Sequence, residues 1–241
     1  MSLKSLQNSV AIVTGGTRGI GRAIAEALLE EGAKVAVCGT TQKSVDDAVA
    51  RLSKAGEVLG LVADIARPDK VKQFVAAVIH QFKSVHTLVN NAGIATFGAV
   101  ADLSPEAWER MIGLNLSGVY YCCREVLPIF KRQGGGDIVN IGSLAGKNPF
   151  AGGAGYNASK FGLNGFTEAM MLDYRHDGVR VSSVMPGSVA TGFGGDSAGS
   201  GADWKIAPED IADVVISMLK MPARTTVSRV EIRPSRPPRK N

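Results

Sequence analysis

Short apolar stretches rich in β-branched residues alternate along the chain with longer segments whose apolar positions recur at helical spacing. The short stretches predict seven strands, at residues 9–14, 34–38, 58–63, 86–90, 137–141, 179–184 and 227–232. The longer segments predict helices, among them residues 22–31, 44–54, 69–82 and 105–130. The strand segments are apolar on both faces, which suits a parallel sheet that helices cover on both sides.

Regular alternation of strands and helices predicts βαβ units, and therefore a doubly wound Rossmann fold of the α/β class. Because no linker divides residues 1–241, we expect a single domain with a seven-stranded parallel sheet. One helix start is marked by Ser104 at the cap and Pro105 at the first helical position. Ligands of such folds bind beyond the carboxyl ends of the strands, so site residues are expected there.

Composition narrows the class of protein. The 241 residues are 45% hydrophobic and 20% charged, as is usual for a globular protein. No apolar run approaches the roughly 20 residues of a membrane span, and the N-terminus lacks a secretory signal, so a cytoplasmic location is expected. The thiols of Cys38, Cys122 and Cys123 lack disulfide or metal-site spacing, and we expect them to be buried and to bind no metal.

The net charge of +5 resides in the C-terminal end of the chain. From Met221 onward six basic residues face a single acid, whereas basic and acidic residues balance in the rest. The neutral body argues against nucleic-acid binding, and residues 233–241 are expected to form a flexible, solvated basic tail. A tail that binds RNA or an acidic partner is the alternative.

A glycine-rich turn follows the first predicted strand and reads Thr14-Gly15-Gly16-Thr17-Arg18-Gly19-Ile20-Gly21. Glycines let the backbone turn sharply and approach a pyrophosphate, which the N-terminus of the following helix would stabilise. The turn is not a P-loop, because Arg22-Ala23 stands where Lys-Ser/Thr is required, and the GxGxxG arrangement is absent. Taken alone, it is either a phosphate-binding turn or only a tight connection.

The end of the second predicted strand bears on the choice of dinucleotide. An NAD site usually places an acid there to bind the ribose 2′-hydroxyl, but Cys38-Gly39-Thr40-Thr41 contains none. Arg18 is a cation suited to a 2′-phosphate, with Thr40 and Thr41 as hydroxyl donors. We therefore predict NADP(H), with an ordinary surface charge as the alternative role for Arg18.

Three residues carry the predicted chemistry. Tyr156 and Lys160 are spaced to share one helix face, and Ser143 follows the fifth predicted strand. A nearby cation lowers the pKa of a phenol by about 1–3 units, which would bring Tyr156 closer to acid–base use. Carbonyl reduction needs a proton donor and a hydrogen bond to the developing alkoxide, and Tyr156 and Ser143 suit these parts. The structural alternatives are a helix-surface pair and a loop hydroxyl.

The motifs together resemble the short-chain dehydrogenase/reductase family over residues 8–232. The matching motifs are Thr-Gly-x-x-x-Gly-x-Gly at 14–21, Asn-Asn-Ala-Gly at 90–93, Asn115, Ser143, Tyr-x-x-x-Lys at 156–160 and Pro-Gly-x-x-x-Thr at 186–191. The resemblance implies a catalytic set, namely Asn115, Ser143, Tyr156 and Lys160. In the family pattern, Lys160 would also hold the nicotinamide ribose hydroxyls, and Asn115 a water that links Lys160 to solvent.

The same resemblance implies a set of cofactor-binding residues. These are Gly15, Thr17, Arg18, Gly19, Ile20, Gly21, Gly39, Thr40, Thr41, Asp64, Ile65, Asn91, Ala92, Gly93, Tyr156, Lys160, Pro186, Gly187, Val189 and Thr191. Among them Asp64 would contact the adenine, with a helix cap as the alternative. Thr191 and the backbone of Val189 would contact the nicotinamide carboxamide.

The resemblance implies an NADP(H)-dependent oxidoreductase that interconverts a small-molecule carbonyl and a secondary alcohol. The pattern looks most like that of 3-oxoacyl-(acyl-carrier-protein) reductases. An NADP(H)-binding sensor or scaffold with little catalysis is the alternative, which the complete set of Asn115, Ser143, Tyr156 and Lys160 disfavours.

Two segments depart from common members of this family. Residues 192–207 are rich in glycine, offer Phe193 and Trp204 as apolar substrate contacts, and are expected to be mobile without ligand. The C-terminus lacks the Gly-Gly pair of many members, which leaves a homodimer and a homotetramer both open. The helix from Asn157 to Tyr174 is the predicted contact surface between subunits.

Overall fold

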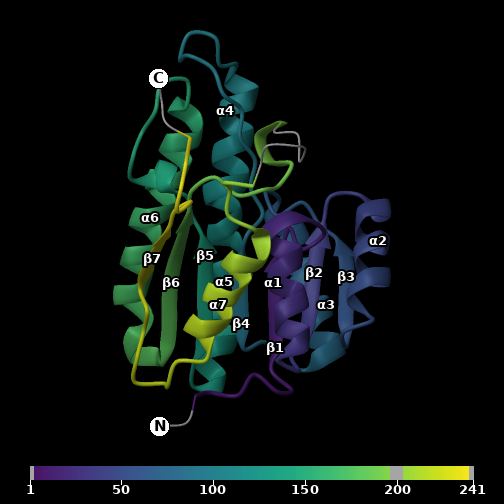
Figure 1. Cartoon of the computed structure of the whole chain (residues 1–241). Helices are drawn as coiled ribbons and strands as arrows, with labels where there is room; N and C mark the ends of the chain where they lie inside the picture. Colours follow the sequence, from purple (N-terminus) through teal and green to yellow (C-terminus); the bar gives the residue numbers. More distant parts are fainter. Residues whose placement is uncertain (1–2, 196–202, 239–241) are drawn as a thin grey trace.

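All seven predicted strands form and build one parallel sheet in the order β3-β2-β1-β4-β5-β6-β7. The structure is a computed structural model that describes residues 3–195 and 203–238 (Figure 1). The strands are β1 Val10–Thr14, β2 Lys34–Gly39, β3 Val58–Val62, β4 Thr87–Asn90, β5 Gly136–Ile141, β6 Val179–Pro186 and β7 Arg229–Ile232. The predicted doubly wound α/β fold is confirmed.

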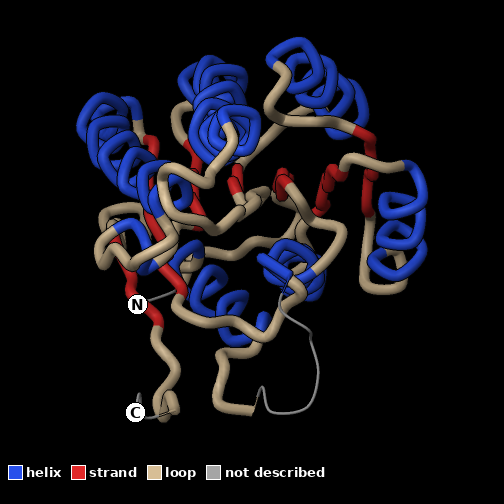
Figure 2. The backbone as a smooth tube through the Cα atoms, turned by 90° about the horizontal axis from the view of Figure 1, so that it is seen from above, coloured by secondary structure: helices blue, strands red, loops and turns tan. Residues whose placement is uncertain are grey.

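Helices cover both faces of the sheet, as the view from above shows (Figure 2). They are α1 Gly19–Glu30, α2 Gln42–Leu52, α3 Pro68–Phe82, α4 Pro105–Ile112, α5 Gly118–Gln133, α6 Ala154–Tyr174 and α7 Pro208–Leu219, with short 3₁₀ turns at Leu144–Gly146, Arg175–Asp177 and Phe193–Gly195. Side chains of α1, α2 and α7 form one buried core and those of α3, α5 and α6 another. Along β1, Val10 and Ile12 face the second core while Ala11 and Val13 face the first, because successive strand residues point to opposite faces.

The segment predicted as one helix over residues 105–130 contains an irregularity. It begins as predicted, because the Ser104 Oγ accepts a hydrogen bond from the Ala107 N–H at 3.2 Å. A π-helical turn, Gly113–Ser117, then separates α4 from α5. Such turns add one residue to a helical turn and occur frequently at functional sites. This one carries Asn115, whose side chain is buried inside the protein.

The strand order reverses between the neighbouring strands β1 and β4. From β1 the sheet continues to β2 on one side, and from β4 it continues to β5 on the other. At the carboxyl ends of these two strands, the Asn91 N–H donates a hydrogen bond to the Thr14 Oγ1 at 3.0 Å. The glycine-rich turn and the Asn-Asn-Ala-Gly segment therefore lie side by side. This is the switch point at which doubly wound folds bind their ligands.

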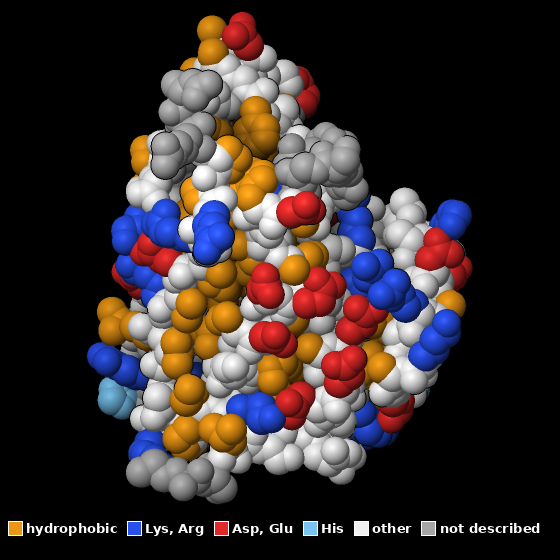
Figure 3. Space-filling model, viewed as in Figure 1, with side chains coloured by type: hydrophobic (Ala, Val, Ile, Leu, Met, Phe, Trp, Pro, Cys, Tyr) orange, Lys and Arg blue, Asp and Glu red, His pale blue; other side chains and the backbone are white. Residues whose placement is uncertain are grey.

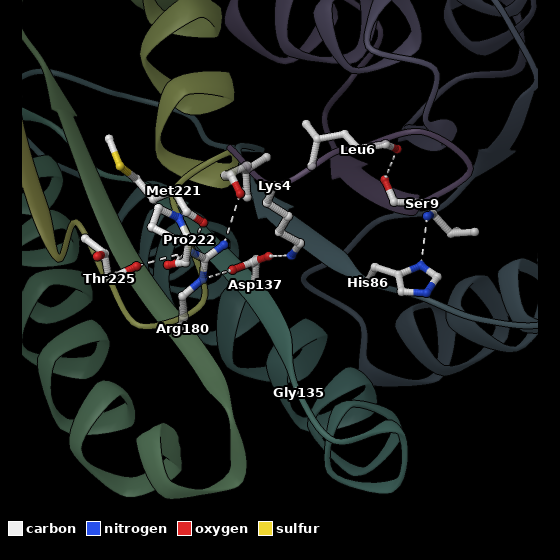
Figure 4. Close-up of polar contacts among 12 residues, drawn as sticks. Lys4, Leu6, Ser9, His86, Gly135, Asp137, Arg180, Met221, Pro222 and Thr225 are labelled. Atoms are coloured by element: carbon white, nitrogen blue, oxygen red, sulfur yellow. Dashed lines mark hydrogen bonds and ion pairs between the residues drawn. The ribbon is translucent and has the colours of Figure 1, made fainter. Parts of the chain in front are cut away.

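At the opposite, amino edge of the sheet, a buried ion pair joins β5 to β6 (Figure 4). The Asp137 carboxylate accepts hydrogen bonds from the Arg180 Nε at 2.6 Å and from the Lys4 Nζ at 2.7 Å. The Arg180 guanidinium also donates to four backbone carbonyls at the end of α7 and beyond it, those of Leu219, Met221, Pro222 and Thr225. Arg180 thus connects both strands to the connection that leads from α7 to β7.

The three thiols are buried and free, as predicted. Burial raises the pKa of Cys38 to about 11 and that of Cys123 to about 12, so both are protonated at neutral pH. Within residues 3–195 and 203–238, no cluster of His, Cys, Asp or Glu is arranged to hold a metal ion. None of the described helices is both long enough and apolar enough to cross a membrane.

Two expectations fall partly on residues outside the described ones. The Gly-rich segment 192–207 is described except for residues 196–202, and the basic tail except for residues 239–241. The described part of the tail, residues 233–238, is mostly exposed. The mobility expected of both segments stays a prediction.

We expect Arg180→Met to lower the free energy of unfolding by about 3–5 kcal/mol, because it leaves the buried Asp137 carboxylate without its main partner. Lys4→Met is the matched control. Its side chain is 42% exposed, so its loss is expected to cost no more than about 1 kcal/mol. Urea unfolding of the three proteins measures the difference, and equal losses in both variants would contradict the assigned role of Arg180.

Candidate active site

The glycine-rich turn after β1 needs glycine for two separate reasons. Gly15 and Gly19 have φ angles of +63° and +54°, in the left-handed region that favours glycine. At Gly21 the limit is space, since a Cβ there would lie 2.3 Å from the Asn91 Nδ2. The turn therefore keeps its backbone bare at the switch point, as a phosphate cradle requires.

Two polar side chains brace this turn. The Asn91 Nδ2 donates to the carbonyls of Thr14 and Gly15 at 3.0 and 3.2 Å. The Thr14 Oγ1 accepts hydrogen bonds from the N–H groups of Asn91 and Ala92 at 3.0 and 3.1 Å. Thr14 was absent from the predicted site residues, although it is the first residue of the motif. Its full burial shows that it acts by holding the turn.

The first turn of α1 has the character of an anion site. Arg18 stands at its N-cap without a capping side chain, so the first N–H groups of the helix are open to an anion. The Arg18 side chain is exposed, and its guanidinium has no ion-pair partner among the residues that the structure describes. These features fit the phosphate groups of a dinucleotide.

At the end of β2, Gly39 and Thr40 lie beside the glycine-rich turn, whereas Thr41 caps the next helix. A Cβ at Gly39 would lie 2.8 Å from the Thr17 Cγ2, so this strand end touches the glycine-rich turn. Thr40 is exposed beside it. Thr41 is the N-cap of α2, and its Oγ1 accepts a hydrogen bond from the Ser44 N–H at 3.3 Å. Thr41 therefore has a structural part in addition to its predicted one.

Asp64 follows β3, and its carboxylate already has two partners. It accepts hydrogen bonds from the Ala66 N–H and the Arg110 Nη1, both at 3.0 Å. The N-cap of α3 is Arg67, so the alternative of Asp64 as the cap of this helix is wrong. The neighbouring Ile65 side chain is buried.

The segment after β6 returns toward the glycine-rich turn. A Cβ at Gly19 would lie 3.2 Å from the Thr191 Cγ2. Val189 forms an isolated parallel bridge with Ile206, and the Gly187 N–H donates to the carbonyl of Ile232 at 2.8 Å. The predicted nicotinamide contacts thus lie on the same edge of the sheet as the predicted phosphate contacts.

Lys160 and Tyr156 on α6 meet the carboxyl end of β5. The Lys160 Nζ donates to the carbonyl of Ile141, the last residue of β5, at 2.9 Å. This Nζ lies 5.9 Å from the centroid of the Tyr156 ring. Ser143 follows two residues after Ile141, and its Oγ accepts a hydrogen bond from the Ala145 N–H at 3.1 Å. The predicted chemical residues are therefore brought together.

Burial is the main cause of the pKa shifts of Tyr156 and Lys160. It raises the pKa of Tyr156, against a smaller lowering by hydrogen bonding with Ser143, and it lowers the pKa of Lys160 to about 8. The predicted lowering of the Tyr156 pKa is therefore wrong in direction, because the cost of desolvating the phenolate is the largest effect on this pKa. At neutral pH Tyr156 is a neutral phenol, and most Lys160 side chains are protonated.

Asn115 fixes the loop that follows β4. Its Nδ2 donates to the Ile94 carbonyl at 2.9 Å and to the Ser159 Oγ at 3.0 Å, and its Oδ1 accepts from the Ile94 N–H at 2.9 Å. A Cβ at Gly93 would lie 3.3 Å from this Oδ1 and 3.9 Å from the Lys160 Nζ. Asn115 thus lies near Lys160, and its predicted part in holding a water stays a prediction.

Sequence reasoning missed several residues that shape this site. The Asn157 Nδ2 donates to the Ala145 carbonyl at 2.7 Å, which ties α6 to the turn after Ser143. Asn157 and Ser159 stand inside the Tyr-x-x-x-Lys motif, so their position was the available signal. Phe97, whose ring packs against Tyr156, carries no signal in the sequence.

Comparison with known proteins gives consistent matches. A family model described as short chain dehydrogenase matches residues 9–199. An uncharacterized oxidoreductase of Staphylococcus saprophyticus is 35% identical, covering 95% of this chain and 98% of that protein. A 3-oxoacyl-(acyl-carrier-protein) reductase of Synechocystis sp. is 37% identical, covering 78% and 77%. The crystal structure of a metagenomic short-chain oxidoreductase in complex with NADP is 35% identical, with coverages of 97% and 100% and a TM-score of 0.85.

Gly21→Ala is expected to lower the free energy of unfolding by about 1–3 kcal/mol, because its methyl group has no room beside the Asn91 side chain and the Gly15 carbonyl. Gly165→Ala on α6 is the control, since nothing lies within 4 Å of a Cβ there. It should instead stabilise the protein by about 0.5–1 kcal/mol. Chemical denaturation measures both, and two changes of the same sign would show that the turn is not crowded.

Proposed function

Because the chain belongs to the short-chain dehydrogenase family, we propose that it is an NADP(H)-dependent oxidoreductase that interconverts a carbonyl and a secondary alcohol. The observation that carries this proposal is the meeting of Ser143, Tyr156 and Lys160 at the carboxyl end of β5. The glycine-rich turn after β1, which Asn91 and Thr14 hold in place, lies at the same edge of the sheet. Residues 1–241 would form one catalytic unit.

The phosphate end of the site supports a dinucleotide. The uncapped first turn of α1 would bind the pyrophosphate, and Asn91 would keep the turn in shape for it. Arg18 and Thr40 would bind a 2′-phosphate, with no acidic residue at the end of β2 to repel it. The NADP complex of the similar metagenomic oxidoreductase supports this choice. When bound, the nicotinamide supplies or accepts the hydride.

Residues of the chain itself would donate the proton that carbonyl reduction needs. The neutral phenol of Tyr156 is in the right state to donate a proton to the oxygen of a carbonyl that is being reduced. The Ser143 hydroxyl would donate a hydrogen bond to the same oxygen. Lys160, a cation at neutral pH, would stabilise the phenolate that Tyr156 leaves behind. In the oxidation direction the same groups would act in reverse.

Two further proposals concern the substrate class and the contact surface between subunits. Similarity to the reductase of Synechocystis sp. supports 3-oxoacyl thioesters as one substrate class to test. The exposed side chains of Phe161 and Leu172 on α6 support this helix as the contact surface of a homodimer or homotetramer.

Tyr156→Phe is expected to reduce kcat for NADPH-dependent carbonyl reduction by about 10²–10⁴-fold, because it removes the proton donor. Tyr120→Phe is the control, since this tyrosine is 45% exposed on α5 and makes its ring contacts with Tyr121 and Phe166 rather than with Tyr156. NADPH consumption against a panel of carbonyls that includes acetoacetyl thioesters measures the effect. Tight NADPH binding by the unmodified protein without turnover would favour the sensor or scaffold instead.

We expect Arg18→Ala to raise the KM for NADPH by about 10–100-fold and to leave that for NADH nearly unchanged, because one charged hydrogen-bonding partner of the 2′-phosphate is lost. Arg175→Ala, at the end of α6 on the amino edge of the sheet, is the control and should change neither value. Steady-state kinetics with both cofactors provide the measurement. Preference of the unmodified protein for NADH would overturn the assignment of Arg18.

A further inference from the structure

Three phenylalanine side chains from separate loops gather around Tyr156. The ring centroids of Phe97 and Phe193 each lie 5.9 Å from that of Tyr156, with interplanar angles of 85° and 53°. The Phe150 ring lies 5.7 Å from that of Phe97 at 62°. We call Phe97, Phe150 and Phe193 the phenylalanine patch. Its members follow β4, precede α6 and follow β6, respectively.

The patch is exposed although Phe97 touches Phe150, and both Phe97 and Phe193 touch Tyr156. Phe97 is 51%, Phe150 47% and Phe193 38% exposed, whereas Tyr156 beneath them is buried at 8%. Figure 3 shows hydrophobic side chains in the upper part of the molecule, where the carboxyl ends of the strands lie, and also in a column down the left half of this face. Contiguous exposed apolar surface is a mark of binding sites, and this surface is continuous with the proposed proton donor.

Backbone contacts hold the patch in place. The Gly98 N–H donates to the carbonyl of Gly152 at 2.8 Å, and Gly98 forms an isolated parallel bridge with Gly153. The loops that carry Phe97 and Phe150 are thereby joined. The third loop meets them at Gly194, where a Cβ would lie 3.2 Å from the Phe97 Cε2. The rings of Phe97 and Phe150 are thus positioned relative to each other before any ligand arrives, which lowers the entropy cost of binding.

The surroundings of Tyr156 below the patch are also apolar. Tyr156 belongs to a small buried cluster with Met111 and Ala145, against which Ile94, Ala95 and Leu103 pack. A group that reaches the phenol therefore loses its contacts with water against hydrocarbon walls. That loss favours an apolar group and disfavours a charged or polyhydroxylated one, whose polar atoms would lack partners.

We propose that the phenylalanine patch is the subsite for the substituent on the carbonyl carbon of the substrate, and that this substituent is uncharged and aromatic. The proposal rests on the proposed function of Tyr156. Aromatic rings prefer edge-to-face contacts with centroids about 4.5–7 Å apart, and the exposed rings of Phe97 and Phe150 offer such contacts beside the phenol. Phe97 and Phe193 then determine specificity, since they touch both Tyr156 and the incoming ring.

The test compares kcat/KM for acetophenone and for dihydroxyacetone, with NADPH, in the unmodified protein and in Phe97→Ala, Phe193→Ala and Phe97→Leu. Acetophenone should be the better substrate. Both alanine variants should lower its kcat/KM by about tenfold or more and change that of dihydroxyacetone less. Phe97→Leu should fall in between, because it keeps apolar area and loses the ring. Tyr120→Ala removes a similarly exposed aromatic side chain of α5, 45% exposed, and should change neither kcat/KM value. Preference for dihydroxyacetone, or equal losses for both substrates, would overturn the proposal.

A separate measurement distinguishes failure of the subsite from failure of the enzyme function. Saturation-transfer NMR detects binding of 1-phenylethanol to the full chain in the presence of NADP⁺. Binding that weakens about tenfold in Phe97→Ala and not in Tyr120→Ala supports the subsite even if no carbonyl is turned over. No binding by the unmodified protein overturns the subsite, whatever the result for Tyr156→Phe.

Discussion

The buried ammonium of Lys160 is the constraint on which the rest of the site depends. A lysine that is 4% exposed has lost nearly all of its water, and such a group needs protein acceptors in return. It finds one in the Ile141 carbonyl at the end of β5. This contact joins α6 to the carboxyl end of β5, close to Ser143. The lowered pKa of Lys160 is a measure of the same desolvation.

A second requirement follows from the way the sheet ends. Backbone N–H and carbonyl groups beyond the last ladder hydrogen bond need other partners when they are buried. Thr14 and Asn91 serve those of the turn after β1, and Asn115 serves those of Ile94 after β4. Much of the family motif therefore has a structural reason that is independent of catalysis. A chain that kept the fold without the chemistry would still benefit from these side chains.

Much of this architecture was predictable from the sequence, because period-2 and period-3.6 patterns are local and strong. The strands, the covered sheet and the helix start at Ser104 followed from them, and the family resemblance located the motifs. The π-helical turn was not predictable, since one extra residue barely disturbs the spacing of apolar side chains. The direction of the Tyr156 pKa was wrong because burial depends on the packed neighbours of the phenol. The patch of Phe97, Phe150 and Phe193 depends on three loops meeting, which no local pattern encodes.

The π-helical turn at Gly113–Ser117 has a consequence for the helix that contains it. A regular α-helix presents one apolar stripe along its length. Met111 of α4 packs against Tyr156, whereas Val119 and Cys122 of α5 pack into the core beneath the sheet. The extra residue of the π-helical turn rotates the apolar face of α5 relative to that of α4. A single continuous helix can thereby contact Tyr156 with one half and support the fold with the other.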